Sequence, residues 1–145
     1  MTQANEGSLG AAVAEAAVSL IGTRYRLHGR DPAHGLDCVG LVEAALREAG
    51  CDWRAPTGYS LRSVEIEPKL AALGAVPLAR IACMPPDRPG DVLLLRAGPA
   101  QVHLAISGPY SAHAPDLVHA HAGLRRVVRL SCSPGWPVLA RWRAT

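Results

Sequence analysis

The chain lacks several features that mark particular classes of protein. It has no phenylalanine, and Lys69 is the only lysine among 15 basic residues, so its positive charge comes almost entirely from arginine. No apolar stretch is long enough to cross a bilayer, because Glu15 interrupts the short run from Leu9 to Ile21. The four cysteines, at positions 38, 51, 83 and 132, form no CxxC pair and show no regular spacing. We therefore expect free thiols and no membrane span.

The composition indicates one folded domain. With 145 residues, of which 49% are hydrophobic and 19% charged, the chain can bury a single core, and we expect one domain over residues 1–145. The net charge of +3 suits an anionic partner such as a cell-wall polymer. No recognition motif for nucleic acid accompanies that charge. The first seven residues lack the basic and apolar parts of a signal peptide, so we expect synthesis in the cytoplasm without one.

The hydrophobic pattern changes along the chain from helical to strand-like. Apolar residues at helical spacing predict three helices, at Leu9–Ile21, Cys38–Ala49 and Val64–Leu73. Short apolar runs bounded by Gly and Pro predict five strands, at Asp91–Arg96, Val102–Ser107, Leu117–His121, Arg125–Leu130 and Val138–Trp142. Helices followed by strands predict an α+β fold, with N-terminal helices packed on an antiparallel sheet.

Cys38 is the most informative residue of the chain. It follows a polar loop rich in Gly and Pro and stands where the second predicted helix begins. The positive end of the helix dipole is expected to lower the pKa of a thiol there and favour the nucleophilic thiolate. Asp37 has two interpretations, since its side chain can cap this helix or contact a substrate. A structural, buried cysteine is the alternative interpretation of Cys38 itself.

Histidines on neighbouring predicted strands can supply the base that a cysteine nucleophile needs. His103 lies on one strand and His119 on the next, so pairing of the two strands through the loop at 108–115 makes them cross-strand neighbours. His121 faces the same side as His119, because residues two apart share one face of a strand. The pattern alone also allows half-buried polar histidines, or a zinc site made of the three histidines and the cysteine.

These motifs resemble those of the NlpC/P60 cysteine peptidases. Four blocks agree in order, character and approximate spacing: Gly22–Tyr25 leading to Asp37–Val42, then Pro89–Leu93, His103–Gly108 and Val118–Ala120. The resemblance implies a papain-like α+β fold. It also implies hydrolysis of the peptide stems of bacterial peptidoglycan, commonly between γ-D-glutamate and a diamino acid.

The resemblance assigns roles to particular residues. It implies Cys38 as the nucleophile, His103 as the base and His119 as the residue that orients His103. It places Tyr25 beside the thiol, where the phenol can hold the oxyanion together with the backbone N–H of Cys38. His121 can share the third role or line the substrate pocket. Such acyl transfer requires neither a metal nor a cofactor.

The closer resemblance is to a phage-type branch of these peptidases, whose small members are encoded with tail proteins of phages and gene transfer agents. The Asp-Cys-Val-Gly-Leu form of the motif and the C-terminal Trp136 and Trp142 fit that branch. The resemblance implies phage-like tail proteins as partners and delivery to the cell wall by a phage-like particle. The alternative function is a structural tail-tip or assembly module that keeps the fold with weak or lost activity.

Three residues depart from the commoner pattern of the family. Val39 stands where a serine is commoner, Arg24 where a proline is usual, and His28 where the first glycine of a pair is usual. These changes leave the nucleophile intact. Arg24 and His28 alter the loop that borders the cleft, and Val39 replaces a serine that can make a polar contact near the substrate, so these residues bear on specificity.

Overall fold

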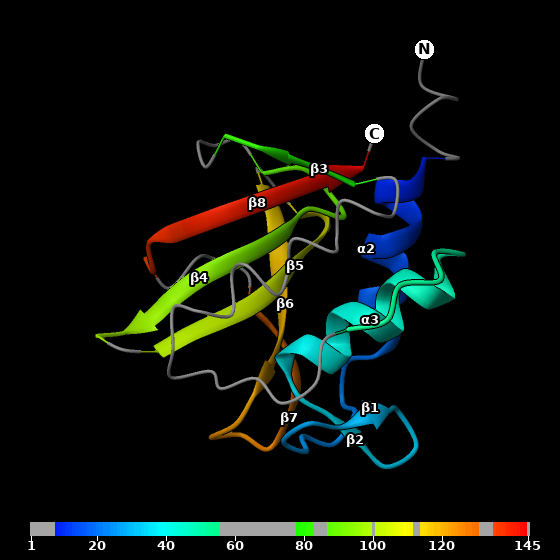
Figure 1. Ribbon diagram of the computed structural model, residues 1–145, viewed down its shortest axis with the longest axis vertical. Coiled ribbons are helices and arrows are strands. Elements are labelled where there is room, and N and C mark those ends of the chain that lie inside the picture. Colours follow the sequence, from blue (N-terminus) through cyan, green and yellow to red (C-terminus); the bar gives the residue numbers. More distant parts are fainter. Residues whose placement is uncertain are drawn as a thin grey trace.

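The computed structural model describes residues 8–55, 78–82, 87–99, 101–111, 114–130 and 135–144 (Figure 1). The predicted helix Val64–Leu73 lies outside these residues. Two helices come first, α2 (Leu9–Ser19) and α3 (Cys38–Glu48). Two short strands, β1 (Arg30–Asp31) and β2 (Gly35–Leu36), form a hairpin between them. Six strands follow: β3 (Leu78–Ile81), β4 (Val92–Gly98), β5 (Gln101–Ser111), β6 (Ala114–His121), β7 (Arg126–Leu130) and β8 (Val138–Ala144).

The six later strands form one antiparallel sheet in the order β3-β8-β4-β5-β6-β7. Both helices pack against each other and against β5, on one side of the sheet (Figure 1). The predicted α+β fold with N-terminal helices on an antiparallel sheet is confirmed. This order also brings β5, β6 and β7, which carry the candidate histidines and their neighbours, side by side.

Alternating side chains divide the apolar residues of the sheet between two faces. Leu94, Leu104 and Ile106 belong to the main core, which fills the space between the sheet and the helices. Leu93 and Leu95 belong to a smaller cluster on the opposite face. Each fully buried leucine contributes about 1.5–3 kcal/mol of transfer free energy, so the main core dominates the stability of the domain.

The helix termini follow from capping residues. The Ser8 side chain accepts a hydrogen bond from the backbone N–H of Ala11 at the start of α2. Helix α3 ends at Glu48, and Gly50, with a φ of 97°, follows its C-cap in the left-handed conformation. Within the described residues, neither helix combines the length and the apolar character that a membrane crossing requires.

Some boundaries differ from those that the sequence predicts. Strand β5 continues to Ser111, although Gly108 and Pro109 predict its end near residue 107. An irregularity between Ser107 and Tyr110 in the pairing with β6 accommodates the proline, which cannot donate to the ladder. The sequence also gives no prediction of β3 or of the β1–β2 hairpin, which are too short for a clear period.

Candidate active site

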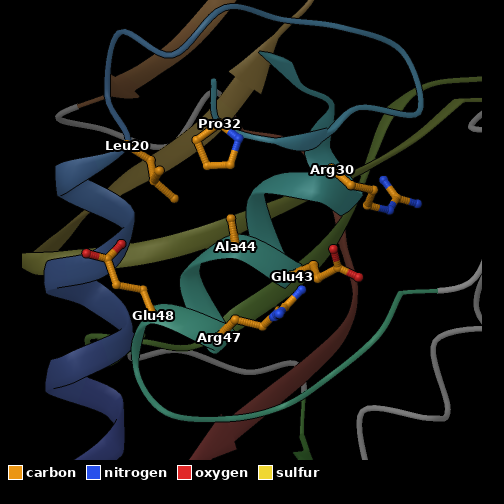
Figure 2. Close-up of a pocket in the computed structure, with 7 residues that line it drawn as sticks. All are labelled: Leu20, Arg30, Pro32, Glu43, Ala44, Arg47 and Glu48. Atoms are coloured by element: carbon orange, nitrogen blue, oxygen red, sulfur yellow. The ribbon is translucent and has the colours of Figure 1, made fainter. Parts of the chain in front are cut away.

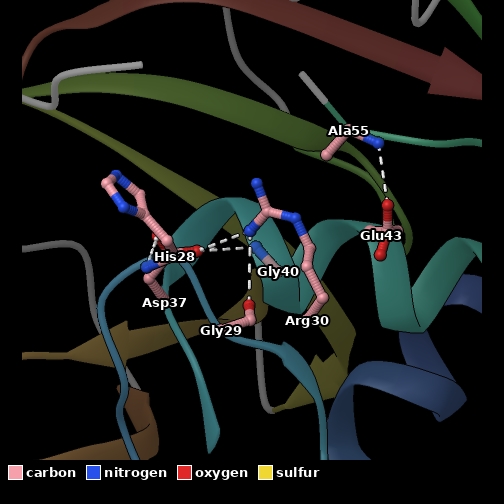
Figure 3. A network of polar contacts seen from close by, with 7 residues as sticks. All are labelled: His28, Gly29, Arg30, Asp37, Gly40, Glu43 and Ala55. Atoms are coloured by element: carbon pink, nitrogen blue, oxygen red, sulfur yellow. Dashed lines mark hydrogen bonds and ion pairs between the residues drawn. The ribbon is translucent and has the colours of Figure 1, made fainter. Parts of the chain in front are cut away.

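The first turn of α3 is held by the carboxylate of Asp37. Its Oδ1 accepts a hydrogen bond from the backbone N–H of Gly40 at 2.8 Å, and its Oδ2 accepts one from the backbone N–H of His28 at 2.8 Å (Figure 3). The guanidinium of Arg30 lies 3.2 Å from Oδ1. Asp37 is fully buried, so the predicted helix cap is confirmed, while its contact with a substrate stays a prediction.

Gly40 allows the preceding loop to pack directly on this turn. A Cβ atom at position 40 would collide with the carbonyl oxygen of Gly29. A side chain there would therefore push away the loop that carries His28 and Arg30, the two residues that bond Asp37. The glycine of the Asp-Cys-Val-Gly motif thus has a steric reason in this chain.

Cys38 is the first residue of α3 and is fully buried in the main core. Burial raises the pKa of its thiol to about 12, since the charged thiolate loses water. The backbone N–H groups of Leu104 and Val39 act in the opposite direction but are the weaker influence on this pKa. The prediction that the helix N-terminus lowers this pKa is therefore wrong, because desolvation outweighs the dipole.

His103 and His119 form a directly bonded pair. The Nε2 atom of His103 lies 2.8 Å from the Nδ1 atom of His119, and the two rings meet edge to face. The strand register explains the contact, because Ile106 of β5 pairs with Val118 of β6. Successive side chains of a strand point to opposite faces. His103 lies three residues before Ile106, and His119 lies one residue after Val118, so both imidazole rings project from the face opposite to Ile106 and Val118.

Trp136 lies against both rings of this pair. The centroid of one of its rings lies 5.9 Å from that of His103 and 6.0 Å from that of His119, in each case nearly perpendicular. The tryptophan also packs on the smaller apolar cluster of this face. The sequence indicated Trp136 only as a mark of the phage-type branch and gave no contact for it, because the residue is distant in sequence from both histidines.

Burial keeps the histidine pair neutral. It lowers the pKa of His103 to about 3 and that of His119 to about 4, with a smaller lowering from the neighbouring imidazoles. His119 is only 1% exposed, and its Nε2 atom has no hydrogen-bond partner among the described residues. Both imidazoles are therefore uncharged near neutral pH and can accept a proton.

Cys38 and His103 lie at neighbouring positions along β5 but on opposite faces of the sheet. Helix α3 packs on β5, and the backbone N–H that influences the Cys38 thiol belongs to Leu104, the residue after His103. Leu104 points into the main core with Cys38, whereas Leu95, the cross-strand partner of His103, belongs to the opposite face. In the described part of the chain, no hydrogen bond joins the thiol to an imidazole.

Tyr25 and His121 lie beside these groups. Burial, together with the nearby Cys38 and Asp37, raises the pKa of the Tyr25 phenol to about 12. This coupling agrees with the predicted position of Tyr25 beside the thiol. The ring of His121 lies 5.5 Å from that of His119, and its Nδ1 atom accepts a hydrogen bond from the backbone N–H of Leu124. It is thus His119, and not His121, that contacts His103.

His28 and His34, in the loop before Cys38, are both exposed. The three histidines and the cysteine do not form a metal-binding group, since no cluster of three or more potential ligands occurs among the described residues.

A pocket of about 250 Å³ lies on another part of the surface, between α2, the β1 hairpin and α3 (Figure 2). Its lining includes Leu20, Pro32 and the last two turns of α3, and Cys38 is not part of it. A helix rises about 1.5 Å per residue, so Glu48 at its end lies about 15 Å along the axis from Cys38. The lining thus contains neither the candidate nucleophile nor the candidate histidines.

Three solved structures have a similar backbone. The NlpC/P60 domain of the peptidoglycan hydrolase SagA matches with a TM-score of 0.63 and 21% identity, covering 92% of this chain and 97% of the other. NlpC1 from Trichomonas vaginalis matches with a TM-score of 0.64 and 19% identity, over 92% of this chain and 44% of that protein. NlpC2 from the same organism gives 0.65 and 18%, over 94% and 48%. The chain has the NlpC/P60 fold.

The predicted papain-like NlpC/P60 architecture is thereby confirmed at the level of the fold. No protein-family model matches the sequence, and no curated protein matches it. The chain spans less than half the length of the two Trichomonas proteins. Within this fold, Val39 is fully buried in the main core, so its difference from the commoner serine concerns packing.

Proposed function

We propose that this chain is a cysteine endopeptidase of the NlpC/P60 family that hydrolyses the peptide stems of bacterial peptidoglycan. The observation that carries the proposal is the His103–His119 hydrogen bond. His103 lies on β5 next to Leu104, whose backbone N–H influences the pKa of the Cys38 thiol. A cysteine nucleophile needs a base and a group that orients the base. SagA, which contains a domain of the same fold, is described as a peptidoglycan hydrolase.

His103 is the proposed base, and its hydrogen bond to His119 determines which of its ring nitrogens can accept the proton. Because Nε2 is engaged with His119, Nδ1 is the nitrogen left to receive the proton of Cys38. A free Nδ1 requires the hydrogen on Nε2, which then donates to Nδ1 of His119. His119 therefore orients His103 and carries its own hydrogen on Nε2.

The reaction follows two steps. Proton transfer from Cys38 to Nδ1 of His103 accompanies attack of the sulfur on the scissile carbonyl carbon. The C–N bond then breaks, and the leaving amine takes the proton from His103, which leaves an acyl-enzyme that water hydrolyses. The backbone N–H of Cys38 and the phenol of Tyr25 are the proposed donors to the oxyanion.

In the resting state that we propose, the thiol of Cys38 and the imidazole of His103 are both neutral. The thiol has a pKa of about 12 and His103 a pKa of about 3, so neither group is charged near pH 7. The proton therefore moves during the attack and not before it, with His103 as a general base.

The finer specificity that we propose is the bond between γ-D-glutamate and the diamino acid of the stem. Digestion of purified peptidoglycan, followed by mass analysis of the fragments, tests it. We expect fragments with a new N-terminal diamino acid, and none with Cys38→Ala. The matched control is Cys51→Ala, which removes the other described buried thiol. If prolonged incubation with the wild-type protein releases no fragments beyond those of untreated peptidoglycan, the proposal is contradicted.

The alternative, a structural tail-tip module, is favoured by one observation, the full burial of the Cys38 thiol. A substrate-mimicking thiol probe separates the two functions. Covalent labelling of Cys38 by a stem peptide with an electrophilic terminus supports the enzyme. Failure of that peptide to label Cys38, together with intact fold and no digestion, supports the structural module.

We also propose that a phage-like particle carries the protein to the wall, with tail proteins as partners. The support is the resemblance of the sequence to the phage-type branch. Immunoblotting of particles purified from the source strain tests the idea. Absence of the protein from particles, with free protein in the cell lysate, would contradict it.

A further inference from the structure

Two arginines extend the face of the sheet that carries the histidine pair. Arg24 bridges to Arg126 of β7, and Arg126 pairs with His121 of β6. Residues that pair across neighbouring strands project to the same face. His121 in turn shares the face of His119, two residues earlier on β6. Arg24, Arg126 and His121 thus form a row across this face, and the row begins two residues from His119.

The backbone brings the two arginines as close as neighbouring strands allow. The N–H of Tyr25 donates to the carbonyl of Arg125 at 2.9 Å, and the N–H of Val127 donates to the carbonyl of Thr23 at 2.8 Å. These bonds flank Arg24 and Arg126, which makes them a non-hydrogen-bonded pair. In such pairs the Cα atoms are about 4.5 Å apart and the side chains are closest. Like charges directly opposite each other are destabilising.

Carboxylates balance other arginines of the described chain but not these two. Ion pairs join Arg30 to Asp37, Arg129 to Asp116, Arg141 to Asp87 and Arg143 to Asp91. Arg24 and Arg126 are exposed and take part in none of the ion pairs of the described residues. The sequence also departs from the commoner family pattern at Arg24, where a proline is usual.

We propose that Arg24 and Arg126 form a carboxylate-binding pair that selects acidic peptides for the candidate active site; this rests on the proposed peptidase function. Two guanidinium groups side by side match the two oxygens of a carboxylate. Neighbouring strands are about 4.8 Å apart, so the pair lies about 5–10 Å from the strand of His119. An extended peptide covers that distance in about two or three residues. A carboxylate bound by the pair is therefore expected two or three residues along the peptide from the part that lies at the strand of His119.

Binding without turnover tests this inference. The protein is the full chain with Cys38→Ala, which cannot form the acyl-enzyme. Two fluorescent stem peptides are compared by anisotropy, one with free carboxylates and one in which every carboxylate is a carboxamide. We expect Arg24→Gln and Arg126→Gln each to weaken binding of the acidic peptide by about tenfold, and to leave binding of the amide peptide unchanged.

The control variant is Arg47→Gln, which removes one exposed charge near the far end of α3 and is expected to change binding less than about twofold. The melting temperatures of Arg24→Gln and Arg126→Gln are expected to equal or exceed that of the parent, because a like-charge contact is relieved. A merely structural role would instead lower them.

Equal affinity of the parent for the two peptides would overturn the inference. Equal losses in Arg24→Gln and Arg47→Gln would overturn it as well, since net charge would then explain the effect. Binding of inorganic polyphosphate without binding of the acidic peptide would identify a polyphosphate site and also contradict the proposal. If the wild-type protein binds the acidic peptide, and binding depends on Arg24 and Arg126, but the protein cleaves no stem peptide, the proposed peptidase function is wrong while the carboxylate-binding pair stands.

Discussion

The buried histidine pair predicts a specific loss of stability in acid. In the folded chain the pKa of His119 is about 4, against 6.5 for an unperturbed histidine. The folded protein keeps this group neutral, whereas the unfolded chain protonates it below about pH 6.5. Its contribution to stability is therefore complete above about pH 6.5 and is lost as the pH falls towards 4. A shift of about 2.5 pKa units, at about 1.4 kcal/mol each, gives a loss of about 3 kcal/mol.

Urea unfolding at about pH 7 and about pH 4 measures this loss in wild type and in His119→Gln. On acidification, the free energy of unfolding of His119→Gln should fall by about 3 kcal/mol less than that of the wild type. The other titrating groups, including the buried carboxylates, are common to both proteins, so the difference reports on His119. The control is His34→Gln, which removes an exposed histidine and should leave the acid dependence unchanged within about 0.5 kcal/mol. Identical acid dependence in wild type and His119→Gln would refute the assignment of His119 as a buried, neutral group.

Three further predictions follow from the same geometry. In steady-state cleavage assays, His103→Ala should lose most of the chemical rate, His119→Ala less, and His121→Ala least; a larger loss for His121→Ala than for His119→Ala would give the third role to His121. Asp37→Ala should lower the free energy of unfolding by about 3 kcal/mol, because it removes a cap and a buried ion pair, and a loss under about 1 kcal/mol in urea titration would contradict this. Iodoacetamide labelling of Cys38, followed by peptide mapping, should keep accelerating up to about pH 10; a plateau below about pH 7 would show a thiolate that burial has not suppressed.

The sequence predicts the fold well because its patterns are local. Helical spacing of apolar residues identified α2 and α3, and Gly and Pro marked most of the strands of the sheet. Among the strand ends that differ from the prediction, the end of β5 beyond Ser107 depends on how β6 accommodates Pro109, which is a property of two strands together. The hairpin formed by β1 and β2 has only two residues in each strand, so no period exists to reveal it.

The contact between the two candidate histidines was predictable from the sequence, whereas the electrostatics of the candidate site were not. The positions of Cys38, His103 and His119 follow from motif order and strand pairing, and the structure brings the two histidines into contact. The pKa of the thiol depends on how deeply the residue is buried, which spacing does not encode. The contact of Trp136 with both rings likewise depends on packing between distant segments.

The arginines illustrate the same limit. Basic residues lie close together in the sequence at Arg125–Arg126 and at Arg141 and Arg143, and the latter two are paired with aspartates in the folded chain. The arginines that remain unpaired among the described residues and meet across strands, Arg24 and Arg126, are about a hundred residues apart in sequence. Tertiary pairing therefore decides which of these arginines have a carboxylate partner among the described residues.

The most direct test of the account is the cleavage of one defined stem peptide by three proteins, with the products identified by mass. Wild type and Cys51→Ala should split the γ-D-glutamyl–diamino acid bond at similar rates. Cys38→Ala, which removes the nucleophile, should release no product while unfolding at a similar temperature. Cleavage by Cys38→Ala at the wild-type rate, or no cleavage by folded wild-type protein, would contradict the claim that Cys38 and the His103–His119 pair form a peptidase site.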